Sequence, residues 1–451
     1  MTSQSQLHER RSFRRGIAAL ALIVALAAPG TARAAAGDLD PTFAGDGTAA
    51  TPALGFYAAT NASAVQSDGK IVAVGYCCAD PAPPPEIFHW KAAVARFLPD
   101  GTLDETFGDD GLVTTDVGSS TDHGEDVAIQ RDGKIVVGVT AYDFLEPLGG
   151  QASTFAVVRY LPDGTLDASF GGDGVVRTSS QPCSSTCDDS DDQVGSVLIQ
   201  PDGKLVAVGN AGPVLRPMAV RYHPDGTLDD TFGTGGVAQS SLIRGGVAPT
   251  GIRQPDGRIL VAGWRGIIRL EADGDIDQTF GVNGLVANPD PGNLYEIALG
   301  PAGTILATTT DLLLGPPSFR VRRWLPGGTP DPAWGVGGVI AVANGFDIFP
   351  GGLAVDKQGS VFVGGRGCGS DDRDDCMAFI ARFDEHGNPD GAYGEGGTAV
   401  YPALADIDDL VFQPDGKLVG TRGELPTTRT RRRFASRASS STRGPRACPA
   451  R

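Results

Sequence analysis

Two short acidic stretches contain the residues best suited to hold a metal ion. Each places four aspartates within five positions, and carboxylate oxygens are the ligands that calcium prefers. Neither stretch has the glycine and terminal glutamate of a calcium-binding loop, so a solvated acidic loop explains the same residues. We therefore expect no required cofactor, with calcium as the one candidate. The eight aspartates are Asp188, Asp189, Asp191, Asp192, Asp371, Asp372, Asp374 and Asp375.

Acid–base catalysis has one candidate histidine, His123, which stands among carboxylates in the segment TDHGED. Of the other histidines beyond residue 36, His223 and His386 fall at expected hairpin turns. The sequence has no GxSxG, HExxH or phosphate-binding loop, and no CxxC pair or histidine cluster for zinc. These absences favour a binding protein over an enzyme, and we predict no catalytic residue.

The elements that would position such residues are set by an internal repeat. One signature is an aromatic residue after a turn of the type GTLD, and the other is a segment of the type QPDGK between apolar residues, whose turn glycine all copies share. Each occurs seven times, and the two alternate at spacings that vary with loop length. The aromatic residues are Phe43, Phe107, Phe170, Phe232, Phe280, Trp334 and Tyr393, and the turn glycines are Gly69, Gly133, Gly203, Gly257, Gly303, Gly359 and Gly416.

Each repeat is typical of four antiparallel strands joined by tight PDG turns. Proline presets the first turn position, aspartate bonds locally, and glycine takes the left-handed conformation. A four-stranded blade cannot bury both of its faces alone, so neighbouring blades must cover it. We therefore predict an all-β, seven-bladed β-propeller in which the N-terminal strand (residues 37–50) joins and closes the last blade. A linear solenoid is the alternative, but it would expose two apolar ends.

Arginine and aspartate recur eight residues apart across the second PDG turn of each blade. A three-residue loop would place them opposite one another, so we predict a structural cross-strand ion pair in each blade. If packing buries such a pair, removing one partner leaves a stranded charge. The pairs are Arg96–Asp104, Arg159–Asp167, Arg221–Asp229, Arg269–Asp277, Arg323–Asp331 and Arg382–Asp390.

The two kinds of turn indicate where a ligand would bind. In an antiparallel blade both PDG turns fall on one face of the disc, and the long variable loops fall on the opposite face. Binding residues are more often found on such loops. We predict ligand contacts on this loop face or in the central channel. The candidate residues on the loop face are Tyr76, Phe88, Trp90, His123, Tyr142 and Phe144.

Seven cysteines fit an oxidising compartment. Cys183 and Cys187 bracket three residues, and Cys368 and Cys376 bracket an acidic loop, so we predict two local disulfides. Such short rings stabilise a fold modestly.

The two ends of the chain differ from its body. Residues 1–36 contain arginines, a short apolar run and small residues, which predicts an export signal of the Sec or twin-arginine type. Residues 37–420 form the expected propeller domain. Residues 421–451 are rich in arginine and serine, which indicates disorder, a degenerate final strand or a reading-frame change. Without the two basic ends the formal charge of −17 becomes about −29.

This acidic body argues against nucleic acid and anionic membranes as partners. We predict no membrane span and an exported monomer that is periplasmic, secreted or at the cell surface.

Two segments of one repeat resemble the delta-60 repeat of exported bacterial proteins. They are QRDGKIVVGVTA and, after a loop, FAVVRYLPDGTLDASFGGDGVV. The resemblance covers about residues 37–420 and implies a propeller-forming unit, but it implies no site residue. Our functional hypothesis is an exported binding module for an unknown protein or glycan. The alternatives are a propeller hydrolase or lyase that uses carboxylates on a polysaccharide or phosphoester, and a structural envelope component.

Overall fold

Repeated four-stranded sheets make up the part of the chain that the computed structural model describes. The described residues lie in one compact unit, Ile17–Leu425, whereas Met1–Gly16 and Pro426–Arg451 form a second unit outside them. The described ranges are 22–26, 35–51, 58–80, 89–145, 150–180, 192–212, 215–243, 249–289, 292–311, 318–342, 347–368 and 376–422.

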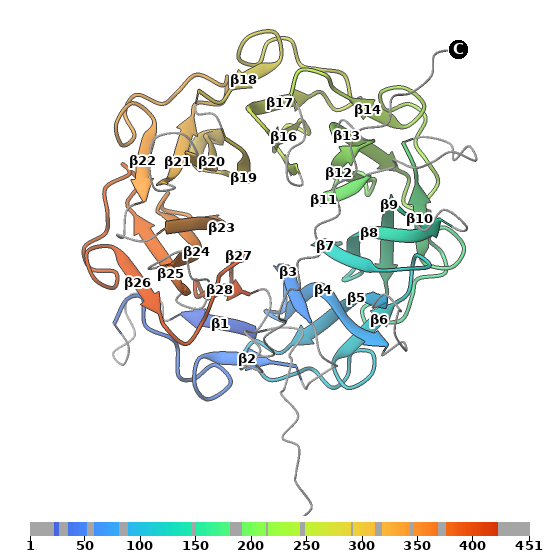
Figure 1. Cartoon of the computed structure of the whole chain (residues 1–451), viewed down its shortest axis with the longest axis horizontal. Coiled ribbons are helices and arrows are strands. Elements are labelled where there is room, and N and C mark those ends of the chain that lie inside the picture. Colours follow the sequence, from blue (N-terminus) through green and yellow to red (C-terminus); the bar gives the residue numbers. More distant parts are fainter. Residues whose placement is uncertain are drawn as a thin grey trace, which may run out of the picture. The chain divides into compact units, whose positions relative to one another are not determined.

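Six of the sheets are blades, each built from four consecutive antiparallel strands (Figure 1). Blade one contains β3 (Ala59–Val65), β4 (Ile71–Asp80), β5 (His89–Phe97) and β6 (Leu112–Thr115). Blade two contains β7 (Asp122–Ile129), β8 (Ile135–Leu145), β9 (Gly150–Tyr160) and β10 (Val175–Thr178). Blade three contains β11 (Gln193–Ile199), β12 (Leu205–Ala211), β13 (Arg216–Tyr222) and β14 (Val237–Gln239).

The remaining three blades follow the same order. Blade four contains β15 (Thr250–Arg253), β16 (Ile259–Gly263), β17 (Gly266–Leu270) and β18 (Leu285–Ala287). Blade five contains β19 (Leu294–Leu299), the 3-10 turn η1 (Pro301–Gly303), β20 (Ile305–Asp311), β21 (Ser318–Trp324) and β22 (Val339–Val342). Blade six contains β23 (Asp347–Val355), β24 (Val361–Cys368), β25 (Cys376–Phe383) and β26 (Thr398–Tyr401).

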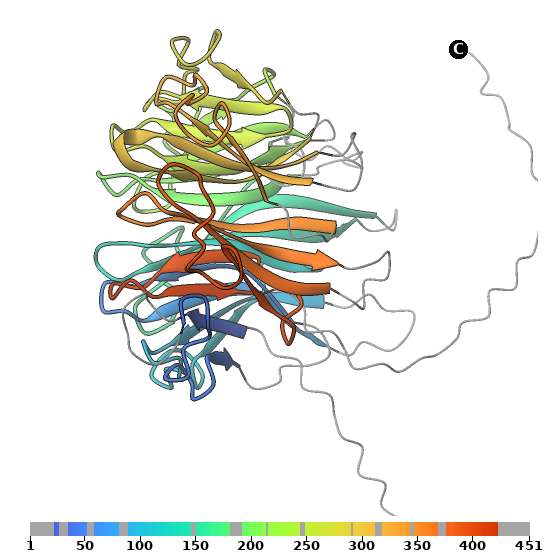
Figure 2. The same ribbon diagram turned by 90° about the vertical axis from the view of Figure 1, so that its left-hand side faces the viewer.

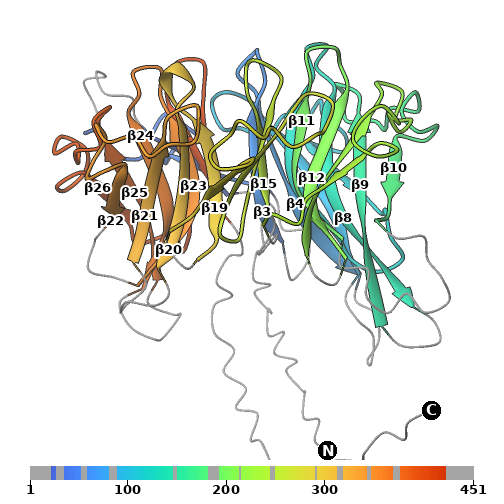
Figure 3. The same cartoon turned by 90° about the horizontal axis from the view of Figure 1, so that it is seen from above.

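The PDG turns form as three-residue loops. In blade one the Leu98 N–H donates to the Thr102 carbonyl at 2.7 Å, and the Gly101 N–H donates to the Leu98 carbonyl at 2.9 Å. Gly101 has a φ of +85°, which favours glycine, and Asp100 accepts from the Thr102 N–H and hydroxyl. The turns gather at one edge of the blades, at the left of Figure 2 and the top of Figure 3.

The apolar core lies between blades. One cluster joins Val72 and Val74 of β4 to Ile135 and Val137 of β8, with the ring of Phe107 buried among them. The inner strands contact one another in the order β3, β7, β11, β15, β19, β23 and β27, and β27 contacts β3 again. The sheets therefore form a closed ring, and each blade is covered by its neighbours, as a propeller requires.

The last sheet, which we call the closing sheet, is assembled from segments far apart in the sequence. Its strands run in the order β2 (Thr48–Ala50), β1 (Leu22–Leu26), β28 (Leu418–Thr421) and β27 (Asp409–Phe412). β1 lies between β2 and β28 and is antiparallel to both.

The prediction of a seven-bladed propeller closed by residues 37–50 is therefore wrong. The chain forms six blades, and a composite sheet stands where a seventh blade was expected. The reason is that β27 and β28 supply only the first two strands of a repeat within the described residues. The third position is taken by Leu22–Leu26, from the segment expected to be an export signal, so that β2 pairs with β1 and not with a C-terminal strand.

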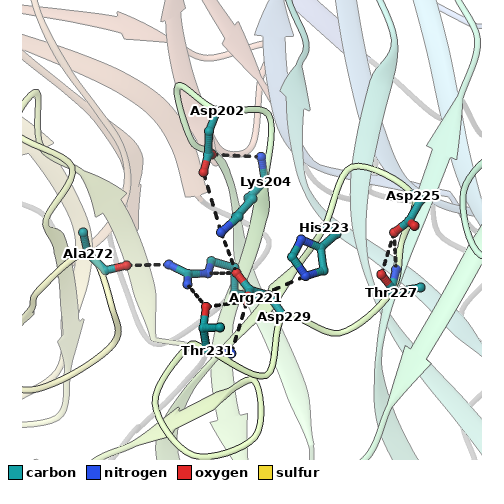
Figure 4. A network of polar contacts seen from close by, with 9 residues as sticks. All are labelled: Asp202, Lys204, Arg221, His223, Asp225, Thr227, Asp229, Thr231 and Ala272. Atoms are coloured by element: carbon teal, nitrogen blue, oxygen red, sulfur yellow. Dashed lines mark hydrogen bonds and ion pairs between the residues drawn. The ribbon is translucent and has the colours of Figure 1, made fainter.

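Five of the six blade arginines join their own blade to the next one, as Figure 4 shows for blade three. Arg221 Nε donates to Asp229 Oδ2 at 2.7 Å, and Nη1 donates to the carbonyl oxygen of Ala272 in blade four at 2.5 Å. The guanidinium lies 4.6 Å from the centre of the Phe232 ring, and Lys204 Nζ lies 2.8 Å from Asp229. This arrangement explains why arginine, aspartate, lysine and an aromatic residue recur together.

The other blades repeat the contact. The nitrogen–oxygen distances are 2.7 Å for Arg96–Asp104, Arg159–Asp167, Arg269–Asp277 and Arg323–Asp331, and 2.8 Å for Arg382–Asp390. The first four guanidinium groups also donate to a backbone carbonyl of the following blade. The structure thus places all six arginine–aspartate pairs in contact, and most of them are buried.

Cys368 and Cys376 form a disulfide across the ends of β24 and β25. Their sequence separation of 8 closes a short ring, so replacing both with serine should lower the free energy of unfolding by about 2 kcal/mol. Chemical denaturation of the double variant measures this loss. A single Cys376→Ser variant is the control and should be no more stable than the double variant. A double variant as stable as the parent chain would contradict the expectation.

Cys183 and Cys187 lie outside the described residues. Within the described part of the chain, no helix is long and apolar enough to cross a membrane.

Candidate functional site

The inner strands carry β-bulges that turn one residue of several blades toward the central axis. Three of the bulges lie between Thr60 and Ala62, between Gly124 and Asp126, and between Val194 and Ser196. The bulged residues are Asn61, Glu125 and Gly195, and each precedes the first residue of the following turn by five positions. Bulges re-aim side chains and are common beside functional sites.

These residues line a pocket of about 220 Å³ in the central channel, which we call the channel pocket. Every inner strand or the residue just before it contributes to the lining, so the pocket exists only because the ring closes. The lining residues are Asn61, Glu125, Val194, Gly195, Thr250, Tyr295, Glu296, Pro350, Gly351 and Asp408.

The channel pocket is acidic. Burial raises the pKa of Glu125 to about 7, although hydrogen bonds from Thr140 and Asn61 oppose the shift. Asn61 Nδ2 donates to Glu125 Oε2 at 3.2 Å. Burial also raises the pKa of Glu296 well above its ordinary value, and the charges of Asp409 and Asp126 add to the effect. Near neutral pH the pocket therefore holds carboxyl groups that can be either protonated or ionised.

On two inner strands, the carboxyl group at the next position along the strand has a structural role. Asp126 Oδ2 accepts the Val197 N–H of the next blade at 2.8 Å. Asp409 Oδ2 accepts both the N–H and the hydroxyl of Ser63 at 2.8 Å. Burial raises the pKa of Asp126 to about 7. These carboxyl groups fix inner strands to one another, so we assign binding chemistry to the bulged residues and not to Asp126 or Asp409.

Four aromatic side chains gather at the loop-face ends of the strands of blades one and two. We call Tyr76, Trp90, His123 and Tyr142 the aromatic cluster. The ring centres of Tyr76 and Trp90 are 4.9 Å apart, and those of Tyr76 and His123 are 4.5 Å apart, both pairs being stacked. Tyr142 meets His123 edge-on at 5.6 Å. Four of the six predicted ligand-face residues therefore lie together.

His123 joins the aromatic cluster to the channel pocket. Its Nδ1 lies 3.9 Å from Glu125 Oε1, and burial lowers the pKa of His123 to about 4. The ring is therefore neutral at pH 7. His123 Nε2 is buried and has no hydrogen-bond partner among the described residues. A neutral imidazole with an unused nitrogen can donate to or accept from a ligand hydroxyl.

The other predicted site residues are placed elsewhere or not at all. Phe144 packs on His89 with ring centres 5.2 Å apart, and Phe88 lies outside the described residues. Seven of the eight candidate calcium aspartates also lie outside them. The eighth, Asp192, is buried and accepts from Ser180 and Gly212, so its oxygens are used within the fold. The described residues contain no group of three or more side chains suited to a metal ion.

The sequence analysis missed Asn61, Glu125, Glu296 and Asp408. Three of these positions are regular, because Asn61, Glu125 and Asp408 stand five residues before Gln66, Gln130 and Gln413, whereas Glu296 stands four residues before Gly300. Alignment of the seven repeats on the turn would have brought these positions into one column. This column contains amide, carboxyl, glycine, proline and tyrosine residues, so it shows no chemical motif.

A family model described as a β-propeller domain of unknown function, DUF5122, matches residues 90–107, 130–170, 200–232 and 254–280. These segments lie in blades one to four and include their second PDG turns. The closed ring of four-stranded sheets gives the described part of the chain a β-propeller fold, and the family match agrees with this fold. A comparison with curated proteins finds no match.

Several solved structures are similar to this chain. A protein from Lactobacillus plantarum is 13% identical, with a TM-score of 0.43 over 82% of this chain and 93% of that one. A protein of unknown function from Dyadobacter fermentans is 11% identical, with a TM-score of 0.39 over 82% and 95%. The polysaccharide lyase Uly1 is 10% identical, with a TM-score of 0.44 over 83% and 91%. Likeness at this level says nothing about activity.

Proposed function

We propose that the protein is an exported binding module that takes a neutral or positively charged saccharide where the aromatic cluster meets the channel pocket. The observation that carries the proposal is the position of His123, which stacks on Tyr76 and also contacts Glu125. Aromatic faces pack against the apolar faces of a ring, and convergent carboxyl and amide groups orient polar ligands. Both kinds of group converge here.

The charge of the channel pocket selects against anions. Its lining residues include three carboxyl groups, those of Glu125, Glu296 and Asp408, and no lysine or arginine. A phosphate, sulfate or uronate would have to lose its water beside these groups without a compensating charge. An amino sugar would instead gain an opposite charge, and a neutral sugar would meet hydrogen-bond acceptors and the Asn61 amide.

The volume of the channel pocket sets the size of the ligand. At about 220 Å³ it is smaller than the ~300 Å³ at which pockets for drug-sized ligands begin. It therefore suits one sugar unit, with any further units lying over the aromatic cluster. This supports recognition of a chain end more than recognition of the middle of a polymer.

A set of neutral, amino and uronic oligosaccharides tests the proposal by direct binding to the full chain. We expect binding of neutral or amino sugars, and Trp90→Ala should weaken it at least tenfold by removing a ring that contacts Tyr76 and His123. Trp264→Ala is the matched control, because Trp264 is half-buried in blade four, away from the cluster, and should leave affinity unchanged. Preference for uronic sugars, or equal effects of both substitutions, would refute the proposal.

Carboxylate-based hydrolysis is the second candidate function, favoured by the pKa of about 7 at Glu125. A general acid works best with a pKa near the working pH, and Glu296 and Asp408 in the same pocket offer a second carboxylate. Glu125→Gln should then abolish hydrolysis of the bound oligosaccharide while binding persists. If no oligosaccharide binds, the remaining candidate is a structural component of the cell envelope.

We further propose that the chain is a delta-60 repeat protein that is exported as a monomer. The recurring QPDGK and GTLD segments support the family, and the arginines and apolar run of residues 1–36 support export. The mass of the chain recovered outside the cytoplasm would test export, since removal of residues 1–36 leaves a defined new N-terminus.

A further inference from the structure

The channel pocket contains one carboxyl group to which the fold supplies no hydrogen-bond donor. Glu296 stands on β19 of blade five, is largely buried and lines the pocket. Its backbone N–H donates to Thr308 Oγ1 at 3.0 Å, but among the described residues no group donates to its carboxyl oxygens. Burying a carboxyl group without a donor costs free energy, so an exception of this kind calls for a functional explanation.

Three other acidic side chains of the inner strands do have donors. Glu125 accepts from Asn61 Nδ2 at 3.2 Å. Asp126 and Asp409 each accept a backbone N–H of a neighbouring blade. The fold therefore holds these three carboxyl groups in place, whereas the donor for Glu296 has to come from a ligand or from water.

The charges around Glu296 select a positively charged donor. The charges of Asp126, Asp408 and Asp409 add to burial in raising the pKa of Glu296. Water or a sugar hydroxyl can donate a hydrogen bond to this carboxyl group, but neither brings an opposite charge. An ammonium group brings both, since it has three N–H donors and a positive charge.

Two arginines of neighbouring strands already have other partners. The charge of Arg422 acts on Asp408, so that carboxyl group is partly compensated. Arg253, on the adjacent strand β15, donates to the Gln254 carbonyl at 3.1 Å, at the turn end of its strand. The lining of the channel pocket itself contains no lysine or arginine. A cationic ligand therefore gains most at Glu296.

We propose that the saccharide bound in the channel pocket carries a free amine, and that its ammonium group contacts Glu296. This inference rests on the proposed function and names the class of sugar within it. The aromatic cluster lies on blades one and two and Glu296 on blade five, so the sugar enters with its amine directed across the channel. Thr250 Oγ1 lines the same pocket, is buried and has no hydrogen-bond partner among the described residues, so it offers a second acceptor.

Three β-1,4-linked tetramers that differ only at carbon 2 test the proposal, those of glucosamine, N-acetylglucosamine and glucose. We expect the glucosamine tetramer to bind the full chain at least tenfold more tightly at pH 7 than the other two. Glu296→Gln should remove this preference and leave the affinity for the glucose tetramer unchanged, because glutamine keeps the size of the side chain and loses its charge. Glu385→Gln is the matched control and should keep the preference, because Glu385 is exposed in the second turn of blade six.

The release of protons on binding gives a second measurement. Burial and the neighbouring aspartates raise the pKa of Glu296, so its carboxyl group is protonated in the free protein at pH 6, and a bound ammonium group favours the ionised form. Calorimetry of the glucosamine tetramer at pH 6, in two buffers with different heats of ionisation, should show the release of about one proton. Glu296→Gln should reduce this release by more than half, and any remainder belongs to Glu125, whose pKa is raised to about 7. The pKa of His123 is lowered to about 4, so its ring is neutral at pH 6 and releases no proton.

The possible outcomes separate this inference from the proposed function. Equal affinity for the glucosamine and glucose tetramers, or a preference that persists in Glu296→Gln, would overturn the inference and leave saccharide binding standing. If none of the three tetramers binds, both proposals fail. Binding of n-butylamine as tight as that of the glucosamine tetramer would also overturn both, because the sugar would then contribute nothing.

Discussion

Replacing Arg159 with methionine is expected to lower the free energy of unfolding by about 3 kcal/mol. Arg159 Nε donates to Asp167 at 2.7 Å, Nη1 donates to the Pro224 carbonyl at 2.5 Å, and the guanidinium lies 4.6 Å from the centre of the Phe170 ring. Methionine keeps the apolar stem but leaves the Asp167 carboxylate buried. Lys134, at 3.0 Å, remains as a partial partner and limits the loss.

Chemical denaturation of the full chain measures this loss, and Arg131→Met is the matched control. Arg131 lies exposed in the first PDG turn of the same blade, so its substitution should change stability by no more than about 0.5 kcal/mol. The pKa of Asp167 adds a second readout. Burial alone would raise it, but bonds from Ser169 and Lys134 and the charge of Arg159 hold it well below its ordinary value. This stability is present above the ordinary pKa and is lost as pH falls below it. If Arg159→Met and Arg131→Met have the same free energy of unfolding, the Arg159–Asp167 pair does not stabilise the blade.

The second large effect concerns the channel pocket, where Glu125→Gln together with Glu296→Gln should stabilise the chain at pH 8 but not at pH 4. Burial raises the pKa of both carboxyl groups, to about 7 for Glu125 from an ordinary value of 4.5. Between these values the folded state binds more protons than the unfolded state, so stability is greatest below pH 4.5 and is lost as pH rises through 7.

Glutamine cannot ionise, so the double variant does not lose this stability as pH rises. About one quarter of the Glu125 side chain remains exposed, so the expected gain at pH 8 is on the order of 2 kcal/mol for the two substitutions together.

Comparing the stability of the double variant with that of the parent chain at each pH separates the effect of the two carboxyl groups from the effect of His123. Burial lowers the pKa of His123 to about 4, so the neutral ring makes stability rise with pH up to about its ordinary value of 6.5. That opposite trend is common to both proteins and cancels in their difference. Thermal unfolding at four pH values between 4 and 8 gives the curve. A constant difference across the range would show that folding does not shift the pKa values of the two glutamates, which would contradict the expectation.

The sequence predicted best those features of the fold that depend on residues close together in the chain. The PDG turn needs its own glycine and aspartate, and Arg96 meets Asp104 because a three-residue loop aligns positions eight apart. Both could be predicted from a single repeat. The repetition also predicted blades in sequence order around a ring, but it predicted seven of them and the structure forms six.

What could not be predicted depends on contacts between distant segments. Leu22–Leu26 pairs with β28, nearly 400 residues away, and its apolar residues are equally suited to an export signal. Glu125 becomes a channel residue only because a bulge turns it inward and six other inner strands surround it. The aromatic cluster was partly foreseen, since Tyr76, Trp90, His123 and Tyr142 were placed on one face, but their contacts needed the structure.

The closing sheet also constrains how the protein is made. Because β27 and β28 follow all six blades in the chain, the ring of blades in a nascent polypeptide cannot close until those strands leave the ribosome. During that interval the outer faces of blades one and six have no partner, and apolar residues such as Ile71 and Tyr393 lack their neighbours from the closing sheet. Synthesis that stops before residue 409 would therefore yield a fragment with exposed apolar surface that is prone to aggregate. Chaperones must bind such a fragment, or proteases must degrade it.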